Sequence, residues 1–210
     1  SLKDKISIID SSISNIKSVS NMLTRIGVES EIIRDEKSLE RANKIILPGI
    51  GSFDAGMRSL QDTGLVEVLN HKVLTDKIPF LGICLGMQLL LEKSEEGSCA
   101  GLGWIEGDVK KFKLYNQGPV SFKVPHMGWN TISEKANEII FKDIFEPKRF
   151  YFVHSYFVCP RNEEDVISMT NYGFDFVSAI KKENIMGVQF HPEKSHRYGM
   201  KLLENFCYLL

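Results

Sequence analysis

A cysteine between two glycines is the first feature of this sequence that could do chemistry. Gly82-Ile83-Cys84-Leu85-Gly86 follows an apolar run and precedes QLLLEK, so the sequence predicts a strand that turns sharply into a helix at Cys84. In such a nucleophile elbow the glycines relieve crowding, and the sulfur lies at a helix N-terminus that favours thiolate over thiol. A free cysteine is most often a small buried apolar residue, so the elbow alone leaves both interpretations open.

A second candidate is the pair His191 and Glu193, which follows the apolar run GVQF. Residues two apart in extended backbone project to the same side, so these two side chains are expected to be neighbours. A nucleophilic cysteine needs an imidazole to take up its proton, and the imidazole needs a third group to fix its tautomer. Taken alone, His-Pro-Glu is more typical of a surface turn. Together with Cys84 it predicts a Cys-His-Glu triad.

Hydrolysis of an amide also requires donors for the oxyanion that develops on the carbonyl. Backbone N–H groups suit this task because they are preorganised. Leu85 offers one N–H directly after the nucleophile, and the segment PGIGSF at 48–53 offers another at Ile50, since its glycines permit unusual peptide orientations. Without Cys84, the same segment would be an ordinary glycine-rich turn.

The elements that must position these motifs alternate between strand and helix in the first half of the chain. Apolar runs at 5–10, 29–34, 44–47 and 79–84 predict strands, and a helical period from Ile16 to Ile26 stops at Gly27. Alternation of this kind implies right-handed crossovers and a largely parallel sheet.

From about Trp104 the apolar runs become shorter and turn residues separate them. The pattern predicts antiparallel or mixed strands at 150–159, 166–170, 177–180 and 185–190, and a final helix at 198–210. No repeat or linker is evident. We therefore expect a single α/β domain over 1–210, with a mixed, mostly parallel, flavodoxin-like central sheet flanked by helices and extended by antiparallel strands.

Composition argues against several classes of protein. The chain has 210 residues, 43% apolar and 25% charged, enough for one sizeable core. Its net charge of −1 leaves no excess for nucleic acid or an anionic membrane. No run of about 18 apolar residues and no secretory signal is evident, so a cytoplasmic location is expected. The four cysteines lack close C-x-x-C spacing, which argues against a zinc site or a disulfide framework, and neither metal nor cofactor is expected.

Three motifs in order resemble those of class I, or triad-type, glutamine amidotransferases: PGIGSF at 48–53, GICLGMQLL at 82–90 and GVQFHPEKS at 187–195. The resemblance implies a glutaminase with Cys84 as nucleophile, His191 as general base and Glu193 as the orienting carboxylate. It also implies that Gly49, Gly51 and Gln88 hold the glutamine.

Two further segments, VPHMGWN at 124–130 and YFVHSYFV at 151–158, resemble the branch of that family that forms the glutaminase subunit of imidazole glycerol phosphate synthase, in histidine biosynthesis. That likeness implies a heterodimer in which ammonia passes to a (β/α)₈-barrel cyclase, since no acceptor-binding domain is expected on this chain. It also implies that Ser155 and Tyr156 contact glutamine through their backbone. The residues implied to face the cyclase are Asn15, Trp129, Asn130, Tyr151 and Lys194; for Trp129 and Tyr151 a core position is the alternative.

One segment departs from the pattern of the family. Where Asp-Tyr-Gly-x-Gly-Asn is usual after the first strand, this chain has Asp10-Ser11-Ser12-Ile13-Ser14-Asn15. The departure leaves the partner and the acceptor open. The alternative is a paralogous glutaminase subunit that feeds a related synthase outside histidine synthesis, for example one that amidates a surface sugar.

Two other classes fit the residues less well. A cysteine peptidase on the same elbow would cleave peptides, whereas Gln88 and the PGIG segment favour a small amide substrate. A regulatory binding protein on this fold would be expected to lack Cys84, His191 or Glu193, and all three are present.

Overall fold

The computed structural model describes residues 5–11, 16–113 and 121–210 of the chain. Its strands are β1 (Ile6–Ile9), β2 (Ser30–Ile33), β3 (Lys44–Gly49), β4 (Phe80–Cys84), β5 (Lys93–Ser94), β6 (Gly107–Lys111), β7 (His126–Thr131), β8 (Ser133–Glu134), β9 (Arg149–His154), β10 (Tyr156–Pro160), β11 (Val166–Asn171), β12 (Asp175–Lys182) and β13 (Ile185–Val188). Its α-helices are α1 (Ile16–Arg25), α2 (Glu36–Glu40), α3 (Phe53–Asp62), α4 (Leu65–Asn70), α5 (Leu85–Gln88) and α6 (His196–Leu209). Short π or 3₁₀ turns lie at His71–Thr75, Ile139–Phe141, Glu163–Asp165 and Pro192–Lys194.

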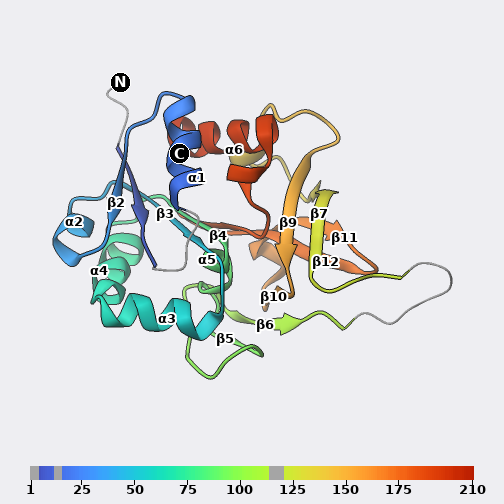
Figure 1. Ribbon diagram of the computed structural model, residues 1–210, viewed down its shortest axis with the longest axis horizontal. Coiled ribbons are helices and arrows are strands. Elements are labelled where there is room, and N and C mark those ends of the chain that lie inside the picture. The colour runs from blue at the N-terminus through green and yellow to red at the C-terminus, as the bar shows by residue number, and fades with distance from the viewer. Residues whose placement is uncertain (1–4, 12–15, 114–120) are drawn as a thin grey trace.

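The central sheet has a parallel half and an antiparallel half. Strands β2, β1, β3, β4 and β13 lie side by side and run parallel. Beyond β13, strands β12, β10 and β6 continue the sheet in antiparallel pairs, and β11 pairs with β12. Figure 1 shows this order from the blue strands to the orange ones. The expected mixed, mostly parallel sheet with added antiparallel strands is confirmed.

Helices cover both faces of the parallel half, because neighbouring residues of each buried strand point to opposite sides. On β3, Ile46 packs with α1 and α6, whereas Ile45 and Leu47 pack with α2, α3 and α4. The predicted helix that stops at Gly27 is α1, and Gly27 has a φ of 78°, which suits glycine. None of the helices in the described part of the chain has the length and apolar run that crossing a membrane requires.

The helix after Cys84 is shorter than the sequence predicts. The residues QLLLEK suggested a helix into the nineties, but α5 ends at Gln88. The next carbonyls bond to a later loop instead: Leu89 O accepts from Leu102 N at 2.8 Å, and Leu90 O accepts from Ile105 N at 3.1 Å. These long-range bonds replace the helical ones, so the prediction was wrong for residues 89–93.

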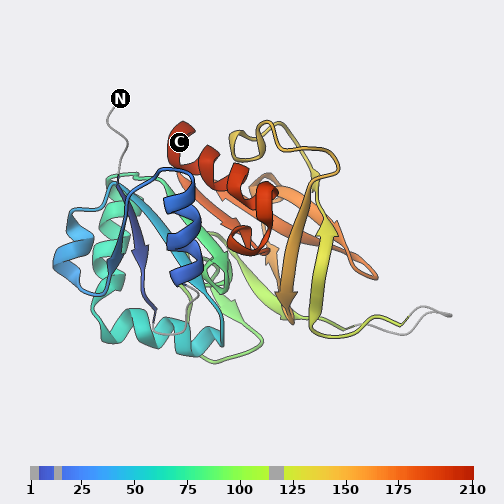
Figure 2. The ribbon, with the colours of Figure 1, turned by 45° about the horizontal axis from the view of Figure 1, so that its top comes forward.

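The expected strand at 150–159 is two strands that belong to different sheets. β9 pairs with β7 in a separate two-stranded ribbon, while β10 joins the central sheet. The chain changes sheet at Ser155, whose carbonyl accepts from Phe112 N at 3.1 Å. Figure 2 shows β7 and β9, in yellow and orange, side by side next to the red helix α6. The break places residues 153–156 beside the end of β4.

Candidate active site

The motifs meet at one edge of the parallel half of the sheet. β3, β4 and β13 are neighbours, with Gly49 paired to Cys84 and Val188 paired to Ile83. Since parallel strands end at a common edge, the turn after Gly49, the nucleophile candidate and the segment after Val188 converge there. Loops outside the carboxyl ends of such strands are the usual place for a ligand.

Cys84 occupies a strained position that its two glycines make possible. The residue has φ 56° and ψ −109°, outside the regions that non-glycine residues normally adopt. A Cβ on Gly82 would lie 2.5 Å from Gly86 O, and a Cβ on Gly86 would overlap with the carbonyl oxygen of Leu47. The G-x-C-x-G spacing therefore follows from close backbone contacts on both sides of the turn.

His191 and Glu193 form a buried pair behind the cysteine. His191 Nδ1 and Glu193 Oε1 are 2.6 Å apart, and their side chains are 1% and 0% exposed. The backbone of His191 is fixed on both sides, since its N–H donates to Tyr151 O at 2.9 Å and its carbonyl accepts from Ser195 Oγ at 2.6 Å. The carboxylate thus fixes the tilt of the imidazole and turns Nε2 away from itself.

The electrostatics of His191 point to a charged imidazole. Burial alone would lower the pKa of His191, but Cys84 and then Glu193 outweigh it and raise this pKa from 6.5 to about 10. Nε2 has no hydrogen-bond partner of normal geometry among the described residues. Contacts of this kind often tighten only when substrate binds. A protonated His191 beside Cys84 is the arrangement that stabilises a thiolate.

The Cys84 sulfur has a further neighbour, Gln189, that the sequence analysis missed. Gln189 Nε2 donates to Cys84 Sγ at 3.5 Å, and the Gln189 side chain is fully buried. A signal for it existed, because Gln189 stands two residues before His191 in extended backbone and so faces the same side. An N–H aimed at the sulfur adds to the stabilisation of a thiolate.

A pocket of about 420 Å³ opens over Cys84. Its lining residues are Ile50, Gly51, Cys84, Leu85, Gln88, Glu96, Val153, His154, Ser155, Tyr156 and Lys194. It includes the two expected oxyanion residues, Ile50 and Leu85, and four of the five expected substrate residues. Gly49, the fifth, is the buried last residue of β3 directly before the pocket wall.

Two charged side chains of opposite sign line this pocket. Glu96 was not singled out from the sequence, because it lies in a turn region with no motif. Lys194 was expected to face a partner, and the structure places it at the pocket as well. The Glu96 carboxylate complements the α-ammonium group of a free amino acid, and the Lys194 ammonium complements its α-carboxylate.

Gln88 spans the floor of the pocket. Its Nε2 donates to Tyr156 O at 3.3 Å and to Gln189 Oε1 at 3.1 Å. Both amide protons are thereby used. The Oε1 atom of Gln88 is the part of this side chain that remains to accept a proton from a ligand.

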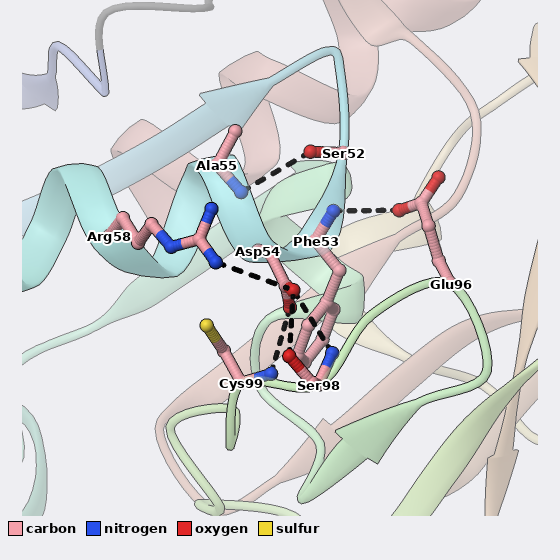
Figure 3. A network of polar contacts seen from close by, with 8 residues as sticks. All are labelled: Ser52, Phe53, Asp54, Ala55, Arg58, Glu96, Ser98 and Cys99. Carbon is pink, nitrogen blue, oxygen red and sulfur yellow. Dashed lines mark hydrogen bonds and ion pairs between the residues drawn. The ribbon is translucent and has the colours of Figure 1, made fainter.

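A polar network attaches Glu96 to the start of α3, next to the PGIG segment. Glu96 Oε1 accepts from Phe53 N at 2.6 Å, and Ser52 Oγ caps the helix by accepting from Ala55 N at 3.2 Å. Asp54 accepts from Ser98 N at 3.0 Å and Cys99 N at 2.9 Å, as Figure 3 shows. The network fixes the loop that carries Glu96 against the loop that carries Ile50.

The residues expected to face a partner lie mostly on the β7–β9 ribbon. Trp129 is 46% exposed and pairs with Tyr151 across the ribbon, with ring centroids 6.4 Å apart. Asn130 is half-buried and donates to Asn171 O at 2.9 Å. The core alternative is wrong for Trp129. Asn15 lies outside the described residues, so the structure does not test it.

The sequence model of class-I glutamine amidotransferases matches residues 7–210, and the chain belongs to that family. Within it the chain belongs with the HisH subunits of imidazole glycerol phosphate synthase. Subunit HisH 2 of Methanococcus maripaludis is 49% identical over 96% of this chain and 98% of the relative. Subunit HisH 1 of the same organism is 45% identical over 98% of this chain and all of the relative. The chain is therefore a glutamine amidotransferase, an enzyme with glutaminase activity.

Solved structures support the fold independently. The structure of PurLQS from Thermotoga maritima aligns with a TM-score of 0.73 at 18% identity, over 100% of each chain. At that identity the likeness concerns the fold alone. It agrees with an α/β domain of the amidotransferase type.

Proposed function

We propose that this chain is the glutaminase subunit of an imidazole glycerol phosphate synthase, with Cys84, His191 and Glu193 as its catalytic triad. The observation that carries the proposal is the placement of the Cys84 sulfur at the base of a pocket, beside a buried His191–Glu193 pair. Full-length likeness to HisH subunits supplies the pathway.

The reaction follows from the charges at the site. The Cys84 thiolate attacks the carboxamide carbon of glutamine, and the N–H groups of Leu85 and Ile50 donate to the oxyanion that forms. His191 gives its proton to the leaving nitrogen, so the C–N bond breaks and ammonia departs from a glutamyl thioester. Water then attacks the thioester, with His191 as the base, and releases glutamate and the thiolate.

Specificity for glutamine is assigned to the charged pair at the pocket. In this proposal Glu96 holds the α-ammonium group, Lys194 holds the α-carboxylate and Gln88 Oε1 accepts from the carboxamide N–H₂, which is supported by the presence of all three residues in the pocket lining. The backbone of Gly49, Gly51, Ser155 and Tyr156 completes the enclosure. A neutral amide without the zwitterion would leave both charged groups unpaired.

The ammonia is passed to a (β/α)₈-barrel cyclase in a cytoplasmic heterodimer. The exposed ribbon residues Trp129 and Met127, 46% and 60% exposed, support a partner-facing surface there. Tyr151 links that surface to the site, since its carbonyl accepts the His191 N–H.

The test is co-purification followed by an ammonia-transfer assay with the recovered partner. Cys84→Ser should keep the fold and the partner but lose glutamine hydrolysis, because an alkoxide is much harder to generate than a thiolate. Added ammonium salt should restore product formation, since only the ammonia source is lost. Turnover of glutamine by Cys84→Ser would remove Cys84 from its role, and failure of rescue with an active partner would refute ammonia supply.

A paralogous subunit that serves a synthase outside histidine synthesis remains the second candidate. The serines at 12 and 14 favour it, and Methanococcus maripaludis has two numbered HisH subunits that both resemble this chain. The acceptor used by the recovered partner distinguishes the two. Product formation from the histidine-pathway intermediate supports the first, and its absence with an active partner supports the second.

A further inference from the structure

Two buried histidines lie outside the triad and bond to each other. His126 on β7 and His154 at the end of β9 are 3% and 6% exposed, and His126 Nδ1 lies 3.0 Å from His154 Nε2. His154 is also part of the pocket wall. The pair therefore connects the β7–β9 ribbon to the site.

The acceptor at one end fixes every proton in the pair. Tyr156 O can only accept, and it lies 2.7 Å from His154 Nδ1, so His154 carries its proton on Nδ1. His154 Nε2 is then an acceptor, and His126 must donate to it from Nδ1. The remaining nitrogen, His126 Nε2, accepts from Asn130 Nδ2 at 3.2 Å. The orientation of the Asn130 amide is set independently, because its Oδ1 accepts from Thr131 N at 2.8 Å.

The chain of bonds continues to the nucleophile. The same Tyr156 carbonyl accepts from Gln88 Nε2 at 3.3 Å. Gln88 donates in turn to Gln189 Oε1, which leaves Gln189 Nε2 to donate to Cys84 Sγ at 3.5 Å. Hydrogen bonds thus run without a break from Asn130 on the ribbon to the sulfur.

The surroundings keep both rings neutral. Burial lowers the pKa of His126 to about 4. Burial also lowers the pKa of His154 to about 3, against the hydrogen bond to the Tyr156 carbonyl, which raises it, and the neighbouring imidazoles of His126 and His191 add to the lowering. The aromatic side chains Phe112, Phe152 and Phe176 pack around the two rings. A neutral imidazole has one donor and one acceptor, and in both rings Nδ1 donates and Nε2 accepts.

We propose that His126 and His154 are positioning residues of the glutaminase reaction, which hold the Tyr156 carbonyl, and through it Gln88 and Gln189, in place against Cys84. If His126 cannot donate, His154 Nε2 is left buried without a partner, and rotation of that ring would release the Tyr156 carbonyl. The amide that donates to the sulfur would then lose its fixed orientation. The proposal rests on the proposed role of Cys84, but its tautomers can be measured without catalysis.

The direct test is the nitrogen NMR spectrum of the histidine rings in the full chain. We expect neutral rings with the proton on Nδ1 at both His126 and His154 between pH 6 and 8. A proton on Nε2 of either ring would overturn the proposal, whatever the activity of Cys84→Ser.

Three variants separate positioning from packing. His126→Leu removes the donor, and we expect glutamine turnover to fall about 10- to 100-fold, as displacement of a reacting group by about 1 Å can produce. His126→Asn keeps a donor near the Nδ1 position and should stay within about threefold of the parent. Phe112→Leu is the matched control, because its ring packs against both histidines, with centroids at 6.5 and 5.0 Å, through apolar contact alone.

The comparison of turnover with thermal stability decides the outcome. We expect His126→Leu and Phe112→Leu to lose similar stability while only His126→Leu loses turnover. Equal turnover losses in those two variants, or no rescue in His126→Asn, would show a packing role and overturn the proposal. Should His126→Leu fail to fold, the tautomers of the parent chain and the turnover of His126→Asn still decide it.

Discussion

At the scale of single residues, the proton on His191 controls the proposed chemistry. This imidazole must be charged to protonate the leaving nitrogen, and its pKa of about 10 keeps it charged at neutral pH. Burial lowers that pKa, whereas Cys84 and then Glu193, through the 2.6 Å contact with Nδ1, raise it. The carboxylate therefore fixes the orientation of the ring and adds to the effect of Cys84 on its charge.

Glu193→Gln should shift the alkaline limb of the profile of kcat/KM against pH to lower pH. The amide retains an acceptor for Nδ1 but loses the negative charge, so the pKa of His191 falls and turnover at neutral pH drops by about 10²–10⁴-fold. Steady-state kinetics from pH 6 to 10 measure this. An alkaline limb at the same pH in both proteins would refute the role of Glu193.

The same proton contributes to stability. The pKa of His191 in the folded chain, about 10, lies above its ordinary value of 6.5. Protonation therefore stabilises the fold fully below about pH 6.5, and this contribution disappears as pH rises toward 10. In Glu193→Gln the pKa of His191 in the folded chain is lower, so this contribution should be smaller and should be lost completely at a lower pH, which thermal unfolding across the same range would show.

Glu96→Gln should raise the KM for glutamine about tenfold or more with little effect on the alkylation of Cys84. The amide can still accept from Phe53 N, so the loop keeps its anchor and only the charge that would face the α-ammonium is removed. Glu95→Gln is the matched control, because Glu95 accepts from Lys111 N at 2.9 Å and is not among the residues that line the pocket. Equal KM values in the two variants would exclude Glu96 from substrate binding.

At the scale of elements, the turn between β4 and α5 determines where the sulfur lies. Gly86→Ala should lower the stability by about 3 kcal/mol or more, because the new methyl group overlaps with the Leu47 carbonyl of a buried strand. For a chain of this size that corresponds to a fall in Tm of about 6–12 °C. Glutaminase turnover should fall with it, since the turn must open to accept the methyl group.

Gly56→Ala provides the control for that substitution. Gly56 is also helical, but its Cβ would meet only leucine side chains, the nearest at 3.1 Å. These can shift, and alanine favours a helix by about 1 kcal/mol over glycine. We expect little change in Tm and full activity. A loss as large as that of Gly86→Ala would contradict the assignment of the effect to the backbone contact.

The elements that the sequence predicted are those determined by local pattern. The elbow followed from glycine spacing, and His191 with Glu193 from the two-residue period of extended backbone. The end of α5 at Gln88 and the break at Ser155 depend on bonds to Leu102, Ile105 and Phe112, which are distant in sequence. Glu96 and the pairing of His126 with His154 were missed as site features for the same reason, because only the folded chain brings Glu96 and His154 to the pocket and His126 against His154.

At the scale of the whole molecule, a backbone hydrogen bond connects the proposed partner surface on the β7–β9 ribbon to the triad. The ribbon carries Trp129 outward, while Tyr151 on its other strand accepts the backbone N–H of His191. The end of β1 at Ile9 lies at the same edge of the sheet as the end of β4. The segment that follows β1 therefore starts from the edge of the sheet where Cys84 lies.

That segment is where the chain departs from its family, and Ser12 and Ser14 lie outside the described residues. We predict that replacing both serines by glycine leaves the partner-free glutaminase rate unchanged but alters stimulation by the cognate barrel subunit. Glycine adopts positive φ without strain and serine does not, so the glycine version has backbone conformations open to it that the parent chain lacks. A stimulation of about a thousandfold would correspond to about 4 kcal/mol of coupling, of which we expect the double substitution to change a part.

The measurement is a titration of cognate and foreign cyclase against both versions of the chain, with the glutaminase rate as readout. The parent chain should respond to its own partner and poorly to a histidine-pathway cyclase from an unrelated source. In the glycine version, stimulation by the cognate and by the foreign cyclase should differ less, because residues 12 and 14 regain the Gly-x-Gly pattern of the family. Identical curves in all four combinations would show that the serines carry no information about the partner, and the histidine-pathway assignment would then stand without a competitor from this segment.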